Sequence, residues 1–164
     1  MAQTQTGIAA FDATDFVWKR AVDAPLTGEG GVVPGIDLAA VLHDAASDLV
    51  TELFGATDLK ALSKLAIRPV LRGISAAFEA PLASGTPVLV GATHGSLSRR
   101  SFELRTGVWA AQSRELVAHG GVVFVVVDTR LRKTVAVPEK VVGALRSLRP
   151  ALGAPHTPVG NQTF

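Results

Sequence analysis

The residues best suited to chemistry lie in a glycine-rich loop and at the start of the helix predicted to follow it. The carboxylates of Glu29 and Asp37 flank this junction. Between them, Gly30 and Gly31 let the loop bend tightly, and Gly35 and Ile36 supply backbone N–H groups at the helix start. The first N–H groups of a helix have no partner within it, so they can bind a developing oxyanion while a nearby carboxylate acts as base or nucleophile. The alternative is an ordinary glycine-rich turn with exposed carboxylates.

Polar side chains also interrupt an apolar strand predicted at residues 88–97. Thr93 and His94 belong to this group, and Ser96 follows them. We expect Thr93 and His94 either to orient a substrate or water, or to face solvent through the alternation of a strand.

The basic side chains are concentrated in the second half of the chain. Residues 1–82 carry 6 basic and 10 acidic side chains, whereas residues 83–164 carry 10 basic and 4 acidic ones. Arg99, Arg100 and Arg132 are candidates for binding phosphates, because the guanidinium group matches their geometry. A solvated basic face is the alternative. Nucleic acid is not predicted as a partner, since the sequence has no Lys/Arg tract with interleaved aromatic residues.

Composition excludes several classes of protein. The 164 residues are 48% hydrophobic and include no cysteine, which excludes disulfides and thiolate chemistry and suits a cytoplasmic protein. No apolar run approaches the roughly 20 residues of a membrane span, and the N-terminus does not resemble a secretory signal. The four histidines share no metal-ligand spacing. We therefore predict no metal and no cofactor.

The predicted elements form one α+β domain at residues 14–148, between a flexible N-terminus (1–13) and a loose tail (149–164). A strand at 15–22 and a glycine-rich loop precede one long amphipathic helix at 36–54. A short helix at 58–65 comes next, and a helix begun by a proline is expected at 138–146.

Between the last two helices the pattern is that of strands, at 67–80, 88–97, 101–109 and 114–128. The short turns between them predict an antiparallel meander. Pro69 is compatible only with the edge of a sheet, and Gly120-Gly121 predicts a bulge or bend. Because too little other sequence remains to cover the long helix, the sheet must curl around it.

Four stretches of this sequence resemble the hotdog thioesterase family, in particular its 4-hydroxybenzoyl-CoA and YbgC/FadM-like acyl-CoA thioesterases. Together they cover roughly residues 15–146. In chain order they are Gly30-Gly-Val-Val33, Ile74-Ser-Ala-Ala-Phe-Glu-Ala-Pro-Leu82 with Ser84-Gly85, Ser98-Arg-Arg-Ser-Phe102, and the strand from Leu116-Val-Ala-His-Gly-Gly121 to Asp128 with Val137-Pro-Glu139.

The resemblance implies a hotdog fold, with about five antiparallel strands wrapped around one central helix. It also implies a homodimer or homotetramer that hydrolyses an acyl-CoA or acyl-carrier-protein thioester. Coenzyme A would then be part of the substrate, and Arg99, Arg100 and Arg132 would contact its phosphates. Another branch of the family has its catalytic acid at mid-helix, which makes Asp44 and His43 further candidates.

The sequence departs from the family pattern just before the helix. The usual acid falls on Gly28, beside Glu29, and the usual His/Asn stretch falls on Pro34–Asp37. Either Glu29, Asp23 or Asp37 substitutes for the acid, or a helix residue does, or the protein binds acyl thioesters without cleaving them. A hotdog hydratase is a weaker alternative, because its Asp/His pair is missing.

Overall fold

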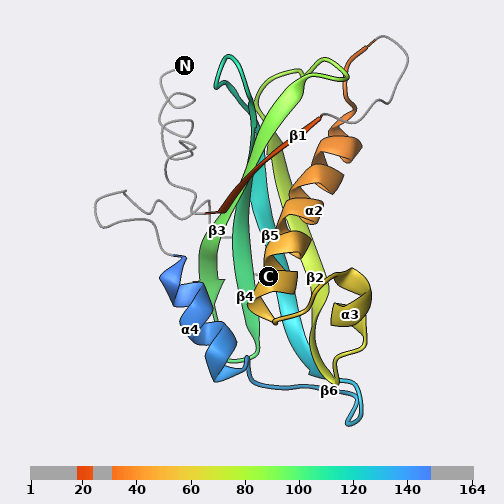
Figure 1. Cartoon of the computed structure of the whole chain (residues 1–164), viewed down its shortest axis with the longest axis vertical. Coiled ribbons are helices and arrows are strands. Elements are labelled where there is room, and N and C mark those ends of the chain that lie inside the picture. The colour runs from red at the N-terminus through yellow and green to blue at the C-terminus, as the bar shows by residue number, and fades with distance from the viewer. Residues whose placement is uncertain (1–17, 24–30, 149–164) are drawn as a thin grey trace.

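One long helix, α2, lies along the concave side of a curved antiparallel sheet (Figure 1). The computed structural model describes residues 18–23 and 31–148. The predicted flexible N-terminus and C-terminal tail lie outside the described residues.

Helix α2 spans Gly35–Leu53, in agreement with the helix predicted at 36–54. Leu38, Leu42, Leu49 and other apolar residues at helical spacing are buried against the sheet. Pro34 precedes the helix in an extended conformation, and the chain leaves it through Gly55, whose φ of 69° favours glycine.

In the described part of the chain the sheet has six strands: β1 (Trp18–Asp23), β2 (Ile67–Phe78), β3 (Pro87–Leu97), β4 (Ser101–Ala110), β5 (Leu116–Asp128) and the short β6 (Lys133–Thr134). The order is β1-β3-β4-β5-β2, and β6 pairs with β5. Strands β3, β4 and β5 form the predicted meander. The prediction was wrong for β2, which pairs with β5 instead of β3 and forms an edge. Pro69 therefore lies on an edge strand, as expected.

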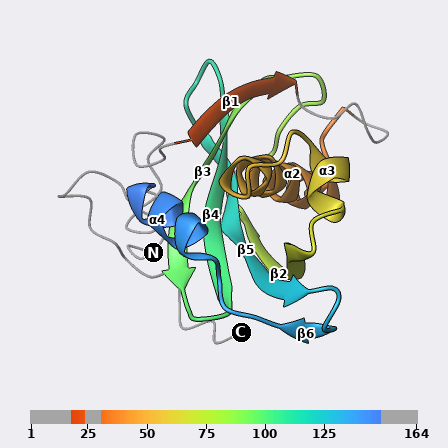
Figure 2. The same ribbon diagram turned by 60° about the horizontal axis from the view of Figure 1, so that its bottom comes forward.

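The concave face of the sheet and the apolar face of α2 form the core. Along β5, the alternate residues Ala118, Val122, Phe124 and Val126 belong to the same apolar clusters as residues of α2. Because side chains of a strand alternate between faces, His119, Gly121 and Val123 lie on the convex face. Seen along the sheet, the strands curve around α2 (Figure 2).

The glycine pair on β5 does not form the predicted bulge. The pairing of Gly120 and Gly121 is continuous with both β2 and β4, and the register shifts lie elsewhere. A Cβ on Gly120 would collide with the Ser75 carbonyl, and one on Gly121 with the Glu103 carboxylate. The two glycines therefore permit close approach of neighbouring groups.

Two short helices complete the described part of the chain. Helix α3 (Leu59–Ser63) begins where Asp58 accepts a hydrogen bond from the Ala61 amide at 2.7 Å. Helix α4 (Glu139–Ser147) follows Pro138 and packs Val141 and Leu145 into the core. Over the residues that the structure describes, no helix has both the length and the apolar character to span a membrane.

Candidate active site at the amino-terminal end of the central helix

The first amides of α2 belong to Gly35 and Ile36. The carbonyl of Pro34 accepts hydrogen bonds from the amides of Asp37 at 3.0 Å and Leu38 at 3.2 Å. Gly35 and Ile36 come before the first of these donors, so no helical carbonyl precedes them at the right spacing. Their N–H groups can therefore serve an external acceptor, at the positive end of the helix dipole.

The chain that leads into α2 is held against the segment that follows β2. The Val33 amide donates to the Leu82 carbonyl at 2.8 Å, and the Ser84 amide donates to the Gly31 carbonyl at 2.7 Å. Gly31 has a φ of 75°, a conformation that favours glycine. Its predicted role in the substrate site stays a prediction.

Apolar side chains border the start of the helix. The ring of Phe78, at the end of β2, lies 3.3 Å from the position that a Cβ on Gly35 would occupy. Phe78 is 51% exposed, Ile36 77% and Val32 51%. Exposed apolar groups of this size, beside amides that have no helical carbonyl as partner, are suited to an apolar ligand that carries a polar acceptor.

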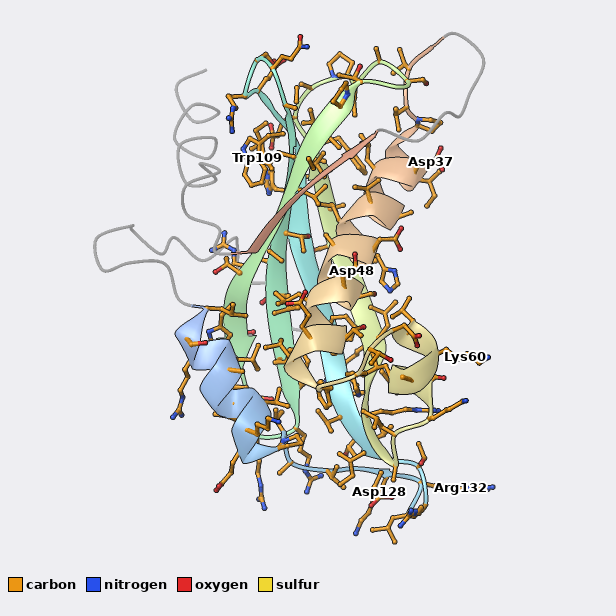
Figure 3. All side chains as sticks on the ribbon, viewed as in Figure 1. Asp37, Asp48, Lys60, Trp109, Asp128 and Arg132 are labelled. Carbon is orange, nitrogen blue, oxygen red and sulfur yellow. The ribbon has the colours of Figure 1, made fainter. Side chains whose placement is uncertain are left out.

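Of the predicted catalytic carboxylates, Asp37 lies at the same end of α2 as the Gly35 and Ile36 amides, whereas Asp44 lies further along the helix. Asp37 is partly buried in the first turn of α2, at the same end of the helix as Gly35 and Ile36 (Figure 3). Asp44 lies at mid-helix with a side chain 71% exposed, and its carboxylate is 3.6 Å from Nδ1 of His43. His43 also lies 3.4 Å from the Ser47 hydroxyl. Glu29 and Gly30 fall outside the described residues.

The structure does not bring Thr93 and His94 to this end of the molecule. Both are buried on β3. The Thr93 hydroxyl donates to the carbonyl of Leu148, just after α4, at 2.6 Å. Their proposed role in orienting a substrate stays a prediction, and the bond to Leu148 gives Thr93 a structural role in addition.

The three arginines predicted to bind phosphates lie at the opposite end of the molecule. Arg99 and Arg100 are exposed in the turn between β3 and β4, and Arg132 is exposed between β5 and β6. Figure 3 shows Arg132 and Asp37 at opposite ends. The 19 residues of α2 span about 28 Å between these ends. Within one chain the arginines and the helix amides therefore do not form one site.

One polar pair near the helix start was not singled out in the sequence. Nε2 of His119 lies 2.8 Å from Oε1 of Glu79, and the two side chains are 10% and 27% exposed. The available signals were a histidine in the apolar strand 116–127 and a carboxylate at the end of another strand. Their pairing is not visible in the sequence, because 40 residues separate them.

Comparison with known proteins gives a structural match and no sequence match. No protein family model matches the chain, and no curated protein matches its sequence. Solved structures do match it. A 1,4-dihydroxy-2-naphthoyl-CoA thioesterase from Synechocystis superposes with a TM-score of 0.69 at 22% identity, covering 80% of this chain and 96% of the other.

Two further structures have the same architecture. A gentisyl-coenzyme A thioesterase matches with a TM-score of 0.65 at 19% identity, covering 77% of this chain and 98% of its own. A Staphylococcus aureus protein solved in complex with CoA matches with a TM-score of 0.73 at 11% identity, covering 90% and 94%. At these identities the comparison establishes the fold, and the chain has the hotdog fold predicted from its sequence.

Proposed function

We propose that this protein hydrolyses an acyl-CoA or acyl-carrier-protein thioester at the amino-terminal end of α2. The observation that carries the proposal is the pair of leading amides at Gly35 and Ile36. They are presented in a fold shared with solved structures of CoA thioesterases.

In the proposed reaction the amides of Gly35 and Ile36 stabilise the thioester oxygen as negative charge develops on it. Asp37 or Glu29 accepts a proton from water, whose oxygen forms a bond to the carbonyl carbon. The carbon–sulfur bond then breaks, and the thiolate leaves and takes up a proton. The products are a carboxylic acid and a thiol. Asp44 and His43 are the alternative acid–base groups.

We propose that the protein assembles through the free edge of β2. This strand ends the sheet, and five large apolar residues along it are 39–51% exposed: Ile67, Val70, Leu71, Ile74 and Phe78. An exposed apolar edge strand is a template for pairing with another chain. A second copy related by a two-fold axis would cover it and form a homodimer. A homotetramer would need a further interface.

Such pairing would also bring the arginines of one copy close to the Gly35 and Ile36 amides of the other. Antiparallel pairing of two β2 strands places opposite ends of the two copies side by side. Arg132 follows Asp128, which pairs with Ile67 at the start of β2, whereas Phe78 and Gly35 mark the other end. Arg132 of one copy would thus approach the helix start of its partner. The phosphates of coenzyme A would bind there. Arg99 and Arg100 lie at the same end of the chain as Arg132 and would contribute further positive charge.

A panel of acyl-CoA and acyl-carrier-protein thioesters, incubated with the protein and a thiol-detecting reagent, tests the proposed reaction. We expect thiol release with at least one acyl group. Thermal stabilisation by acyl-CoA without thiol release would support the alternative of a non-catalytic acyl-thioester or lipid-binding protein. Neither effect with any thioester would exclude both functions.

A further inference from the structure

We propose that Glu79 and His119 form a positioning pair that holds the amino-terminal end of α2 in place. The inference rests on the proposed function, since it assigns these residues to the geometry of the same site. It concerns the arrangement of the backbone and gives neither residue a place at the reacting atoms.

The pair joins the end of β2 to β5. The 2.8 Å contact between His119 Nε2 and Glu79 Oε1 is a hydrogen bond to a carboxylate, which is stronger than one between neutral groups. The His119 side chain is 10% exposed and that of Glu79 27%, so the contact is partly shielded from water. The amide of Glu79 also donates to the Val117 carbonyl at 2.8 Å. Glu79 is therefore fixed to β5 through both its backbone and its side chain.

The segment that begins at Glu79 carries the chain that enters α2. Leu82 and Ser84 make the two backbone hydrogen bonds to Val33 and Gly31, and Val32 forms a β-bridge with Ala83. In residues 78–84 Glu79 is the only charged residue. Its contact with His119 therefore anchors this segment to β5 through a charged side chain.

The residue just before Glu79 reaches the helix directly. Phe78 places its ring 3.3 Å from the Cβ position of Gly35, the first residue of α2. Holding Glu79 in place therefore also holds two contacts with the helix start. One is the Phe78 ring on Gly35, and the other is the set of backbone hydrogen bonds to residues 31–33. Loss of the pair should loosen the amides of Gly35 and Ile36 while the rest of the core stays intact.

Hydrogen exchange of individual amides tests this directly. In Glu79→Ala we expect the amides of Val33 and Ser84 to exchange about tenfold faster, as for loss of one hydrogen bond to a charged group. The Phe54 amide, which donates to Val50 at the far end of α2, should be unchanged. Glu79→Gln keeps an acceptor oxygen and should restore most of the protection. His119→Ala should reproduce the effect, and the double variant should add little to either single one.

A matched control is available on the same sheet. Glu103 accepts a hydrogen bond from the Ser96 hydroxyl at 3.1 Å, so Glu103→Ala removes another carboxylate contact between strands. It should leave the exchange of Val33 and Ser84 unchanged. For thioester hydrolysis we expect Glu79→Ala to lower kcat about tenfold and to leave KM within about twofold of the wild-type value. Misplaced amides stabilise the transition state less, whereas substrate binding is little affected.

Two outcomes would overturn the inference. One is normal exchange at Val33 and Ser84 in Glu79→Ala. The other is faster exchange at Phe54 as well, which would show a loss of stability throughout the fold. If the wild-type protein releases no thiol from any thioester, the proposed function fails. The exchange measurements would still decide whether Glu79 and His119 hold the helix start.

Discussion

The ring of Phe78 lies against the backbone of Gly35, 3.3 Å from where a Cβ would stand. Gly35 is the first residue of α2, and Phe78 is the last residue of β2. The Phe78 ring therefore packs the end of the edge strand directly against the backbone at the start of the helix. A methyl group at Gly35 would push the ring away, and the half-exposed ring has room to move.

Gly35→Ala is expected to lower thioester hydrolysis without unfolding the protein. Gly35 is not among the glycines with a positive φ, so alanine fits its backbone, and the cost is that of a small displacement of the Phe78 ring. The displaced ring changes the surroundings of the Gly35 and Ile36 amides, so we expect kcat to fall by about tenfold. Thiol release and thermal unfolding would be measured together.

Gly143→Ala is the matched control, because Gly143 lies in α4 with nothing within 4 Å of its Cβ position. It should raise the free energy of unfolding by about 0.5–1 kcal/mol and leave hydrolysis unchanged. Equal activity in Gly35→Ala and Gly143→Ala would argue against a site at the start of α2.

The two glycines of β5 should differ sharply when each is replaced by alanine. In Gly120→Ala the new methyl group meets the Ser75 carbonyl, which belongs to the backbone of β2 and cannot rotate away. In Gly121→Ala it meets the Glu103 carboxylate, the end of a flexible side chain. We expect a loss of about 3 kcal/mol for Gly120→Ala and about 1 kcal/mol or less for Gly121→Ala, measured by urea unfolding. Equal losses would contradict the close approach at Ser75.

This pair of glycines also shows what local sequence patterns can and cannot predict. The helical spacing of Leu38, Leu42 and Leu49 is a local signal, so α2 was predicted to within one residue at each end. The partner of a strand is not a local property. A bulge or bend was predicted at Gly120-Gly121. The close contact of Gly120 with Ser75 was not predicted, because Ser75 lies 45 residues away in the sequence and on a strand wrongly placed beside β3.

The same limit applies to the candidate site. The helix start near Ile36 was predicted from Pro34 and Gly35, which mark where a helix begins, and from the helical spacing of the apolar residues that follow. The contact between Glu79 and His119 was not predicted, since it depends on β2 lying beside β5. The arginines were identified by type, but only the fold shows that Arg132 lies far from Asp37 in one chain.

Charge placed on the β2 edge should prevent self-association. Ile74 is 39% exposed on β2, and Ile74→Arg would bury a charge between two apolar edges, at a cost of several kcal/mol. Light scattering coupled to size-exclusion chromatography should show a monomer for Ile74→Arg and a dimer for the wild type. Leu59→Arg is the control, since Leu59 is 54% exposed on α3. Monomeric Leu59→Arg with dimeric Ile74→Arg would place the interface elsewhere.

Among the candidate carboxylates we expect one to be necessary for hydrolysis. Replacing Glu29, Asp37 or Asp44 singly by Ala should lower kcat about tenfold or more for one of the three, as for loss of a general base. Glu52→Ala is the control, because Glu52 is exposed near the opposite end of α2. Near-normal activity in all three variants would reject these residues as the base.

Two arginines allow a matched test of phosphate binding. Arg132 and Arg114 both have a positive φ, 51° and 62°, in exposed turns. Replacing either by glycine relieves about 1 kcal/mol of backbone strain in the folded protein. Part of this gain in the free energy of unfolding is lost, because glycine also increases the conformational entropy of the unfolded chain. The free energy of unfolding should therefore change similarly in Arg132→Gly and Arg114→Gly. Any difference between them in substrate binding then reports on the guanidinium group.

We expect Arg132→Gly to raise KM for an acyl-CoA by up to about fivefold, since an exposed ion pair contributes at most about 1 kcal/mol. Arg114→Gly should leave KM unchanged. An acyl-pantetheine thioester, which lacks the nucleotide phosphates, should be hydrolysed equally by both variants. Raising the salt concentration should narrow the difference between the two variants, because screening weakens the Arg132 contact. An equal KM for acyl-CoA in both variants at low salt would show that Arg132 does not bind the phosphates.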